Sequence, residues 1–286
     1  MKSLVWLASY PKSGNTWMRL LFAAYQKSPD DENFELSDAY HATMSESRRQ
    51  AFERIAGKTD LTNQEIDELR EAVQIDLSNR VRPPVLIKTH NARVQHNGFP
   101  IIRRELTLGA IYIVRNPLDV VDSVADHWGV DHDRAIAMMN DRNLTIGGPK
   151  QDLVTQYLES WSGHVTSWID QRAFPVHVVC YEDLLARTEI TFRNVLTFLG
   201  WDPDPERIER AIAETDFRRL QKREKEAGFG ERSNKSKSGT FFRSGKAERW
   251  RETLSEDQVK RVIEVHEEVM KRFCYQTIVA ARESVD

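Results

Sequence analysis

Cysteine is scarce in this chain, which has only Cys180 and Cys274 among its 286 residues. So few cysteines argue against a disulfide framework and favour a reducing cytoplasm. Both lie in apolar stretches, so we expect both thiols to be buried and inert. Long apolar runs are also missing, and without about 18 consecutive apolar residues we expect no membrane span. The first residues, MKSLVWLASYP, reach a proline too soon for a secretion signal and are typical of a first strand.

A large charge excess is missing too, because 41 Lys and Arg against 44 Asp and Glu leave a net charge of −3. This balance argues against a general nucleic-acid binder. The charges are nevertheless unevenly distributed: Arg218–Arg251 holds twelve basic and four acidic residues. That segment carries +8 and the remainder −11, which favours a compact anionic ligand, although a solvated loop would have the same composition.

Short apolar strands alternate with helical patterns along the chain. This alternation predicts a mainly parallel sheet with helices on both faces. No internal repeat and no Pro/Gly linker divides the sequence, so we expect one α/β domain over residues 1–286. The predicted strands are Leu4–Ala8, Val85–Ile87, Gly109–Val114 and Val176–Cys180. The predicted helices are Thr16–Gln26, residues 62–77 with a capping box, a helix from Pro117, Leu153–Ile169, Ile190–Leu199, Pro205–Glu214 and Ser255–Arg272.

The stretch YPKSGNTW, residues 10–17, connects the first predicted strand to the helix that follows it. Residues 11–15 are therefore expected at the carboxyl end of the sheet, where open α/β folds bind ligands. There the free amides of the first helical turn attract an anion. Gly14 lets the backbone come close to that anion, and Lys12 adds positive charge. Ser13 and Thr16 supply hydroxyl donors. The pattern predicts a phosphate-binding loop, although a tight strand–helix turn with a surface lysine would look similar.

A second polar segment, RNPLDVVDS, follows the predicted strand Gly109–Val114. Arg115 leaves the strand directly, and Ser123 lies on the next helix, on the same face as Asp119 and about one turn further on. Arg115 can offer a bidentate fork to a phosphate, and Ser123 can add a hydroxyl. Asp119 is compatible with simple capping of the helix.

Three motifs in this order, YPKSGNTW, RNPLDVVDS and the late FFRSGKAERW, resemble those of the cytosolic sulfotransferases. The resemblance runs from Trp6 to about Arg251. It implies a P-loop-kinase-like, three-layer α/β/α fold and an enzyme that takes a sulfuryl group from 3′-phosphoadenosine 5′-phosphosulfate (PAPS) and releases adenosine 3′,5′-bisphosphate (PAP). Residues 227–247 would then form a flexible basic loop that closes over the donor.

The resemblance also implies the donor contacts. The first loop would cradle the 5′-phosphosulfate, and Arg115, Ser123 and Arg243 would hold the 3′-phosphate. The late motif is similar to the family pattern FxRKGxxGDWK, but Ser244 replaces a lysine and Glu248-Arg249 replaces Gly-Asp. Tyr181, Thr215 and Phe217 are weaker matches that plain packing would also explain. The implied set is Lys12, Ser13, Gly14, Asn15, Thr16, Trp17, Arg115, Ser123, Tyr181, Thr215, Phe217, Phe241, Phe242, Arg243, Ser244 and Gly245.

The catalytic base implied by the resemblance is His90, in the segment Lys88-Thr89-His90 at the carboxyl end of a predicted strand. A neutral histidine suits removal of a hydroxyl proton at pH 7. Lys12 would meet the charge on the leaving phosphate oxygen, and Lys88 would stabilise the sulfuryl oxygens. The family's Leu-Pro after this histidine is replaced by Asn91-Ala92. No Asp, His or Cys cluster has metal-ligand spacing, so no metal is expected.

Two other classes stay open. A P-loop kinase or nucleotide hydrolase would explain the loop, but it requires the order Gly-Lys-Ser/Thr, and this loop has Lys12-Ser13-Gly14 instead. It also requires an acidic magnesium ligand after a strand; the strands from Val85 and Gly109 do not end in an acidic residue, and the Val176 strand reaches Glu182-Asp183 only after Tyr181. A non-catalytic nucleotide-binding protein of the same fold would be expected to lack Lys12 or His90, and both are present.

The acceptor is expected to be a small molecule with a hydroxyl group, under two cap segments at Ala42–Val81 and Asp126–Pro149. The second contains aromatic residues and methionines that favour a partly apolar pocket, although helix packing explains them as well. Its histidines are the reserve candidates for the base. These cap residues are His127, Trp128, His132, Met138 and Met139. The sequence leaves the oligomeric state open.

Overall fold

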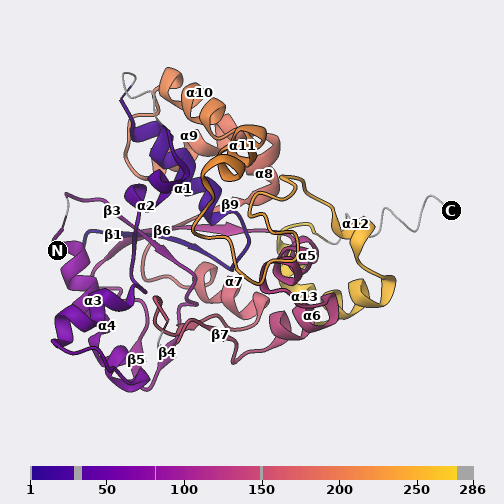
Figure 1. Ribbon diagram of the computed structural model, residues 1–286. Helices are drawn as coiled ribbons and strands as arrows, with labels where there is room; N and C mark the ends of the chain where they lie inside the picture. The colour runs from indigo at the N-terminus through magenta and orange to yellow at the C-terminus, as the bar shows by residue number, and fades with distance from the viewer. Residues whose placement is uncertain (1, 29–33, 81, 149–150, 276–286) are drawn as a thin grey trace.

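A five-stranded parallel sheet forms the centre of the protein (Figure 1). The computed structural model describes residues 2–28, 34–80, 82–148 and 151–275. The strand order is β2-β3-β1-β6-β9, so the first strand lies in the middle, with the second and third predicted strands on either side. The strands are β1 (Leu4–Ser9), β2 (Met44–Ser45), β3 (Val85–Thr89), β6 (Thr107–Val114) and β9 (Val176–Cys180).

Helices cover both faces of the sheet, as Figure 1 shows. Along β1, Trp6 and Ala8 pack into one core and Val5 and Leu7 into the other, which is why the whole strand is apolar. One layer contains α1 (Asn15–Gln26), α2 (Ala39–Ala42), α8 (Tyr181–Ala186), α9 (Thr188–Phe198), α10 (Pro205–Glu214) and α11 (Phe217–Ala227). The other contains α3 (Arg49–Ala56), α4 (Asn63–Ser78), α5 (Pro117–Trp128), α6 (His132–Asn140), α7 (Trp161–Ile169), α12 (Trp250–Thr253) and α13 (Glu256–Arg272). The predicted three-layer α/β/α fold is confirmed.

Short elements complete the chain. They are a 3₁₀ turn η1 (Leu36–Asp38), the hairpin of β4 (Gln95–His96) with β5 (Phe99–Pro100), and the pair β7 (Thr145–Ile146) with β8 (Gln156–Tyr157). None of the helices formed by the described residues is long and apolar enough to cross a membrane.

The prediction of a helix over Leu153–Ile169 is wrong in its first half. Gln156 and Tyr157 form β8 and pair with β7 instead. Glu159 then takes a left-handed conformation with φ 61°, and the Ser160 hydroxyl accepts a hydrogen bond from the amide of Gly163, so the helix begins at Trp161.

The prediction for the cysteines is wrong for Cys274, which is exposed near the end of the described chain. Cys180 at the end of β9 is partly buried. Burial raises the pKa of its thiol to about 12, so this thiol stays protonated and unreactive at neutral pH.

Candidate active site

A cavity of about 660 Å³ opens at the carboxyl edge of the sheet, where β1, β3 and β6 end. Every residue of the predicted site except Ser13 lines it. Ser13 is 1% exposed, and its Oγ has no hydrogen-bond partner among the described residues. The predicted residues that line the cavity are Lys12, Gly14, Asn15, Thr16, Trp17, Lys88, His90, Arg115, Ser123, Tyr181, Thr215, Phe217, Phe241, Phe242, Arg243, Ser244 and Gly245.

The loop between β1 and α1 turns sharply through two left-handed residues, Lys12 at φ 67° and Gly14 at φ 104°. A Cβ at position 14 would lie 2.7 Å from the Tyr181 ring, so only glycine fits there. The Asn15 side chain points inward and donates to the Leu7 carbonyl at 3.1 Å. Asn15 can therefore offer a ligand its backbone amide, at the start of α1, where helix amides are free.

Two buried lysines face the cavity. The Lys12 ammonium lies 4.0 Å from the centroid of the Phe241 ring and 3.5 Å from Nδ1 of His127. Burial lowers the pKa of both Lys12 and Lys88 to about 8. Both are therefore mainly charged at neutral pH yet poorly solvated, a state that favours pairing with an anion.

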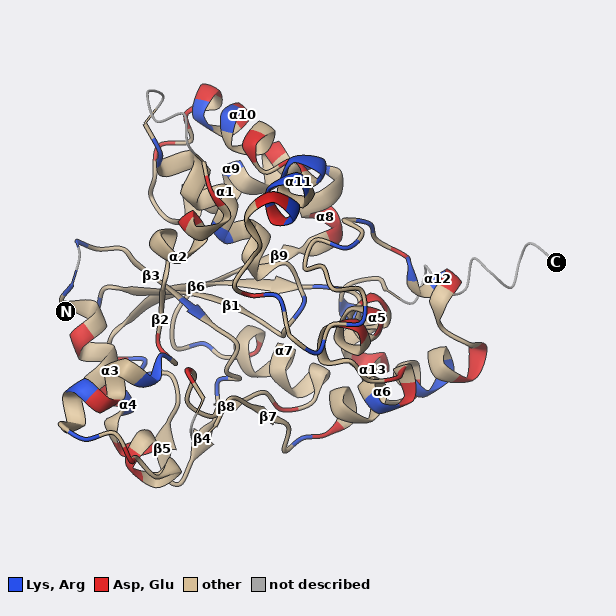
Figure 2. Cartoon of the chain, viewed as in Figure 1, with Lys and Arg blue, Asp and Glu red and all other residues tan. Residues whose placement is uncertain are grey.

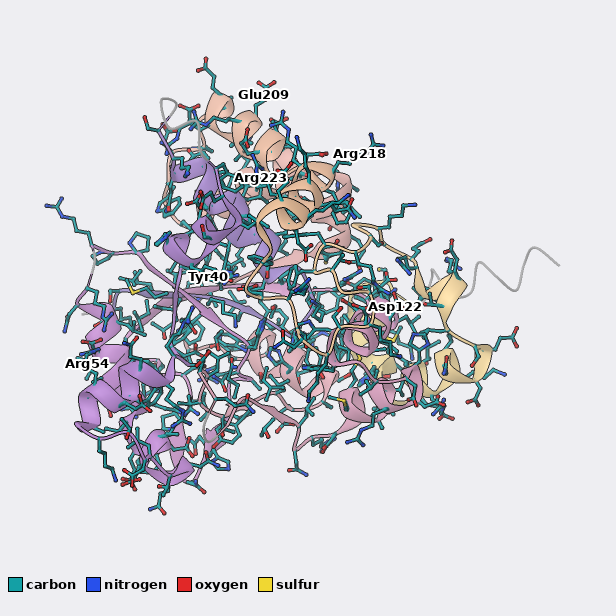
Figure 3. The ribbon with its side chains drawn as sticks, in the orientation of Figure 1. Tyr40, Arg54, Asp122, Glu209, Arg218 and Arg223 are labelled. Carbon is teal, nitrogen blue, oxygen red and sulfur yellow. The ribbon has the colours of Figure 1, made fainter. Side chains whose placement is uncertain are left out.

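Three cationic side chains line the cavity beside α5. The guanidinium carbon of Arg115 lies 4.4 Å from the centroid of the Tyr181 ring, and the guanidinium donates a hydrogen bond to the Lys12 carbonyl at 3.1 Å. Arg243 forms an ion pair with Asp122 on α5, the residue before Ser123. Arg249, which the sequence motifs did not single out, lies 3.5 Å from the same carboxylate. Asp122, labelled in Figure 3, thus pairs with two guanidinium groups, and the next residue, Ser123, lines the same cavity.

The late motif folds despite its departures from the family pattern. Gly245 approaches Phe217 so closely that a Cβ there would lie 2.4 Å from the ring. Glu248 occupies the position of the pattern's second glycine and adopts φ 63°, the left-handed conformation in which glycine is least strained. The carboxylate of Asp119 accepts hydrogen bonds from the amides of Glu248 and Trp250 at 2.7 and 3.1 Å. Asp119 therefore anchors this turn to α5.

His90 lies at the end of β3, and its Nδ1 is 2.9 Å from the Ser9 carbonyl oxygen. Because a carbonyl only accepts, Nδ1 carries the proton of the neutral ring and Nε2 is left as the proton acceptor. Burial, and next the charge of Lys88, keep the pKa of His90 well below 6.5, so the ring is neutral at pH 7.

His164 on α7 supports His90 from behind. Its Nε2 donates to the His90 carbonyl at 3.1 Å, and the Tyr112 hydroxyl donates to its Nδ1 at 2.8 Å. The sequence motifs missed His164, although helical spacing puts it on the same face as the buried Trp161 and Trp168.

Glu46, which precedes α3, was also missed, and it carried no sequence signal. Its Oε1 accepts hydrogen bonds from Thr89 Oγ1 at 2.6 Å and from Asn91 Nδ2 at 2.7 Å. The amide of Ala92 donates to the Tyr157 carbonyl at 2.7 Å. Asn91 and Ala92, which replace the Leu-Pro of the family pattern, therefore connect the end of β3 to Glu46 and to β8.

The rest of the cavity lies toward α2 and β8, with a mixed lining. The first predicted cap contributes Ser45 and Arg48, and the second contributes His127, Trp128 and Ile146. Met139 is instead buried in the core, and His132 lies 3.5 Å from Asp122. Val81 and Pro149, which end the two predicted caps, lie outside the described residues.

Most of the basic segment faces away from the cavity. Figure 2 marks both basic and acidic residues along α10 and α11, and Arg219 and Arg223 pair with Glu214. Of the twelve basic residues between 218 and 251, Arg243 and Arg249 line the cavity. Glu224 holds the following loop by accepting hydrogen bonds from the amides of Phe241 and Phe242 at 2.6 and 2.9 Å.

Within the described ranges, no three His, Cys, Asp or Glu side chains gather in a way that could hold a metal ion. The positive charge around the cavity comes from lysine and arginine side chains and from the free amides of α1.

Comparison with known proteins identifies the family. Residues 2–274 match the model of the sulfotransferase domain. The chain is 25% identical over 280 residues to cytosolic sulfotransferase 12 of Arabidopsis thaliana, covering 93% of this chain and 76% of that protein. The solved structure of mouse sulfotransferase SULT7A1 with PAP has a TM-score of 0.61 at 19% identity, over 98% of this chain and 90% of that one. Retinol dehydratase with retinol and PAP also has a TM-score of 0.61 at 19% identity, over 95% and 82%. The chain belongs to the sulfotransferase family.

Proposed function

We propose that this protein transfers the sulfuryl group of PAPS to the hydroxyl of an acceptor molecule, with His90 as the general base. The observation that carries this proposal is the tautomer of His90: Nδ1 is held by the Ser9 carbonyl, which leaves Nε2 free in a cavity that also contains Lys12 and Lys88. Family membership and the PAP bound in two proteins of the same fold support the donor.

The donor fits the charge distribution of the cavity. The loop from Lys12 to Trp17 would hold the 5′-phosphosulfate with the amides of α1. Arg115, Ser123 and Arg243 would hold the 3′-phosphate, and we add Arg249 because it shares Asp122 with Arg243. Tyr181, Trp17 and Phe217 would enclose the nucleoside.

The reaction is an in-line displacement at sulfur. The acceptor oxygen forms a bond to sulfur while the bond from sulfur to the bridging phosphate oxygen breaks, and the acceptor proton moves to Nε2 of His90. The leaving oxygen gains negative charge, which Lys12 can stabilise, and Lys88 can pair with the sulfuryl oxygens. Because both lysines are poorly solvated, each charge acts with little screening by water.

The two competing classes are less well supported. A P-loop kinase would require an acidic magnesium ligand at a strand end, but β3 ends in Lys88-Thr89 and β6 is followed by Arg115. A purely nucleotide-binding protein would not require the chain of hydrogen bonds from Tyr112 through His164 to His90.

The acceptor side supports a small molecule with polar and apolar parts, because Arg48 and Gln156 line the cavity together with Trp128, Ile146 and Leu153. We keep Ala42–Val81 and Asp126–Pro149 as proposed caps. The name of the Arabidopsis relative supports a cytoplasmic location.

Calorimetric titration with PAP, adenosine 5′-monophosphate and ATP tests the donor. We expect PAP to bind at least tenfold more tightly than the monophosphate, because charge-assisted contacts to the 3′-phosphate contribute about 1.5–3 kcal/mol each. The variant Arg115→Ala should reduce the difference in affinity between PAP and adenosine 5′-monophosphate. Equal affinity for PAP and the monophosphate, or tightest binding of ATP, would contradict the proposal.

Turnover by His90→Ala tests the base. With an aliphatic alcohol acceptor we expect a loss of roughly 10²–10⁴-fold, with PAP affinity nearly unchanged. His127→Ala is the matched comparison, because His127 also lines the cavity. If His127→Ala lost more turnover than His90→Ala, His127 would have to be the general base.

A further inference from the structure

An acidic side chain occupies the cavity that we assign to an anion. Glu231 lies on the irregular segment after α11, and its side chain is 24% exposed. Its Oε2 accepts a hydrogen bond from Thr16 Oγ1 at 2.6 Å, and its Oε1 forms an ion pair with Arg19. Thr16 and Arg19 lie three residues apart at the start of α1, so they share one face of the helix.

Arg19 has no part in the donor or base contacts described above, although it lines the same cavity. Its side chain is 4% exposed, and its Nε has no hydrogen-bond partner among the described residues. The charge of Arg19 contributes to lowering the pKa of both Lys88 and His90, after the larger effect of burial. Arg19 is therefore a buried guanidinium that lines the same cavity as Lys88 and His90, with hydrogen-bonding capacity to spare.

Neighbouring aromatic rings fix the backbone of Glu231. Phe229 packs against Phe241 and Phe242, with ring centroids 5.0 and 5.5 Å apart, and stacks on Tyr40 at 6.2 Å. A Cβ at Gly230 would lie 2.9 Å from the Tyr40 hydroxyl, so glycine allows the chain to pass there. The Glu231 side chain can change rotamer while these contacts hold its backbone.

Glu231 and a bound phosphosulfate would compete for the same partners. The Thr16 hydroxyl has one proton to donate, and Glu231 already accepts it. Arg19 and Lys88 also hold the pKa of Glu231 below its usual range, so at neutral pH the carboxylate is charged and repels a second anion.

We propose that Arg19 binds the sulfuryl group of the donor, and that Glu231 occupies Arg19 and Thr16 until the donor displaces it. The inference rests on the proposed function, because it takes PAPS as the donor. Glu231 thus keeps the buried guanidinium paired while the site is empty, and Arg19 joins Lys88 around the sulfuryl oxygens once the carboxylate has rotated away.

Three ligands that differ only at the 5′ position test the competition: PAPS, PAP and adenosine 3′-monophosphate. For Glu231→Gln we expect PAPS to bind about tenfold more tightly than to the unchanged protein, PAP to gain less, and adenosine 3′-monophosphate to be unaffected. Glu226→Gln is the matched control, because it removes the same charge from the exposed surface of α11, where Glu226 pairs with Lys222 at 3.8 Å. It should alter none of the three affinities.

Uniform weakening of all three ligands by Glu231→Gln would overturn the proposal, because Glu231 would then only hold its loop in place. Three unchanged affinities would overturn it as well. Failure of PAP to bind the unchanged protein would instead refute the proposed function itself.

The role of Arg19 is tested in the Glu231→Gln background, where no carboxylate is left buried without its partner. Adding Arg19→Gln should weaken PAPS about tenfold more than it weakens PAP, because PAP lacks the sulfuryl group. Thermal unfolding checks that the double variant is folded. Equal losses for PAPS and PAP would show that Arg19 does not bind the sulfuryl group, and Arg19→Lys in the same background should recover part of the loss if it does.

Discussion

Whether a side chain at this site can reach a ligand depends more on its burial and its existing hydrogen bonds than on its residue type. Asn15 and Thr16 both belong to the phosphate loop, yet the Asn15 side chain points inward to Leu7 and the Thr16 hydroxyl points into the cavity. Ser13 lies between Lys12 and Gly14 but is buried. From the motif alone, all three side chains would be assigned as polar contacts to the ligand. The left-handed turn between β1 and α1 determines which of them can reach it.

Lys12 and Lys88 make donor binding dependent on pH. Burial lowers the pKa of each to about 8, so each loses its positive charge as the pH rises above that value. PAPS keeps its charge there, because its 3′-phosphate loses its last proton near pH 6. We expect the affinity for PAPS, which carries the sulfuryl group assigned to Lys88, to change little from pH 7 to 7.5 and to fall up to about tenfold per pH unit above pH 8 for each lysine, as measured by calorimetry.

The variant Lys88→Arg provides the control for this pH dependence. Its guanidinium stays charged up to about pH 12, so the affinity should fall less steeply above pH 8 while the contribution of Lys12 remains. A constant affinity up to pH 9.5 in the unchanged protein would show that neither ammonium contacts the ligand.

Among the elements, those with apolar periodicity and a local capping pattern were predicted well. The strand Val176–Cys180 and the helix Pro205–Glu214 have the predicted bounds, and the capping box at Thr62 starts α4. The helix over Leu153–Ile169 failed because Gln156 and Tyr157 pair with Thr145 and Ile146, a contact that local sequence does not encode. The links made by Glu46 and His164 could not be placed for the same reason, since they join segments far apart in the chain.

The turn after Gly245 offers a test at the same scale. Glu248 holds a left-handed backbone conformation, which costs a residue with a side chain about 1–2 kcal/mol. Glycine avoids that strain but loses about 0.5–1 kcal/mol more backbone entropy on folding. We therefore expect Glu248→Gly to raise the free energy of unfolding by about 0.5–1 kcal/mol, measured by denaturant titration.

Glu248→Ala separates backbone strain from side-chain contacts in that test. It removes the ion pair with Arg251 at 3.2 Å but keeps the strained conformation. It should be no more stable than the unchanged protein, because an exposed ion pair contributes little. If the glycine and alanine variants had equal stability, strain at position 248 would not be the cause.

In the whole molecule, carboxylates accompany the cations at both ends of the proposed donor cavity. Asp122 lies on α5 beside Arg243 and Arg249, and Glu231 lies near Tyr40 beside Arg19; Asp122 and Tyr40 are well separated in Figure 3. In this arrangement a protein with a net charge of −3 contains a basic site in which Arg19, Arg243 and Arg249 are already paired with carboxylates.

Buried histidines make the stability of the whole fold sensitive to mild acid. Burial lowers the pKa of His164 and His266 to about 4, whereas an unfolded histidine titrates near 6.5. Between these values the unfolded chain binds protons that the folded chain does not, so the stability is fully present above pH 6.5 and is lost as the pH falls toward 4. Each group can contribute up to about 1.4 kcal/mol per pH unit.

We expect the free energy of unfolding, measured by denaturant titration, to fall steadily from pH 7 to 5. The variant His266→Gln should reduce that slope by up to about 1.4 kcal/mol per pH unit. His266 suits this comparison because it packs on Trp161 at 5.4 Å and does not line the cavity, so PAP affinity should not change. Burial raises the pKa of the Asp119 and Glu182 carboxyls, which acts in the opposite sense but is the same in both proteins. A slope that stays the same in His266→Gln would mean that His266 does not stay neutral in the fold, and that the acid sensitivity arises elsewhere.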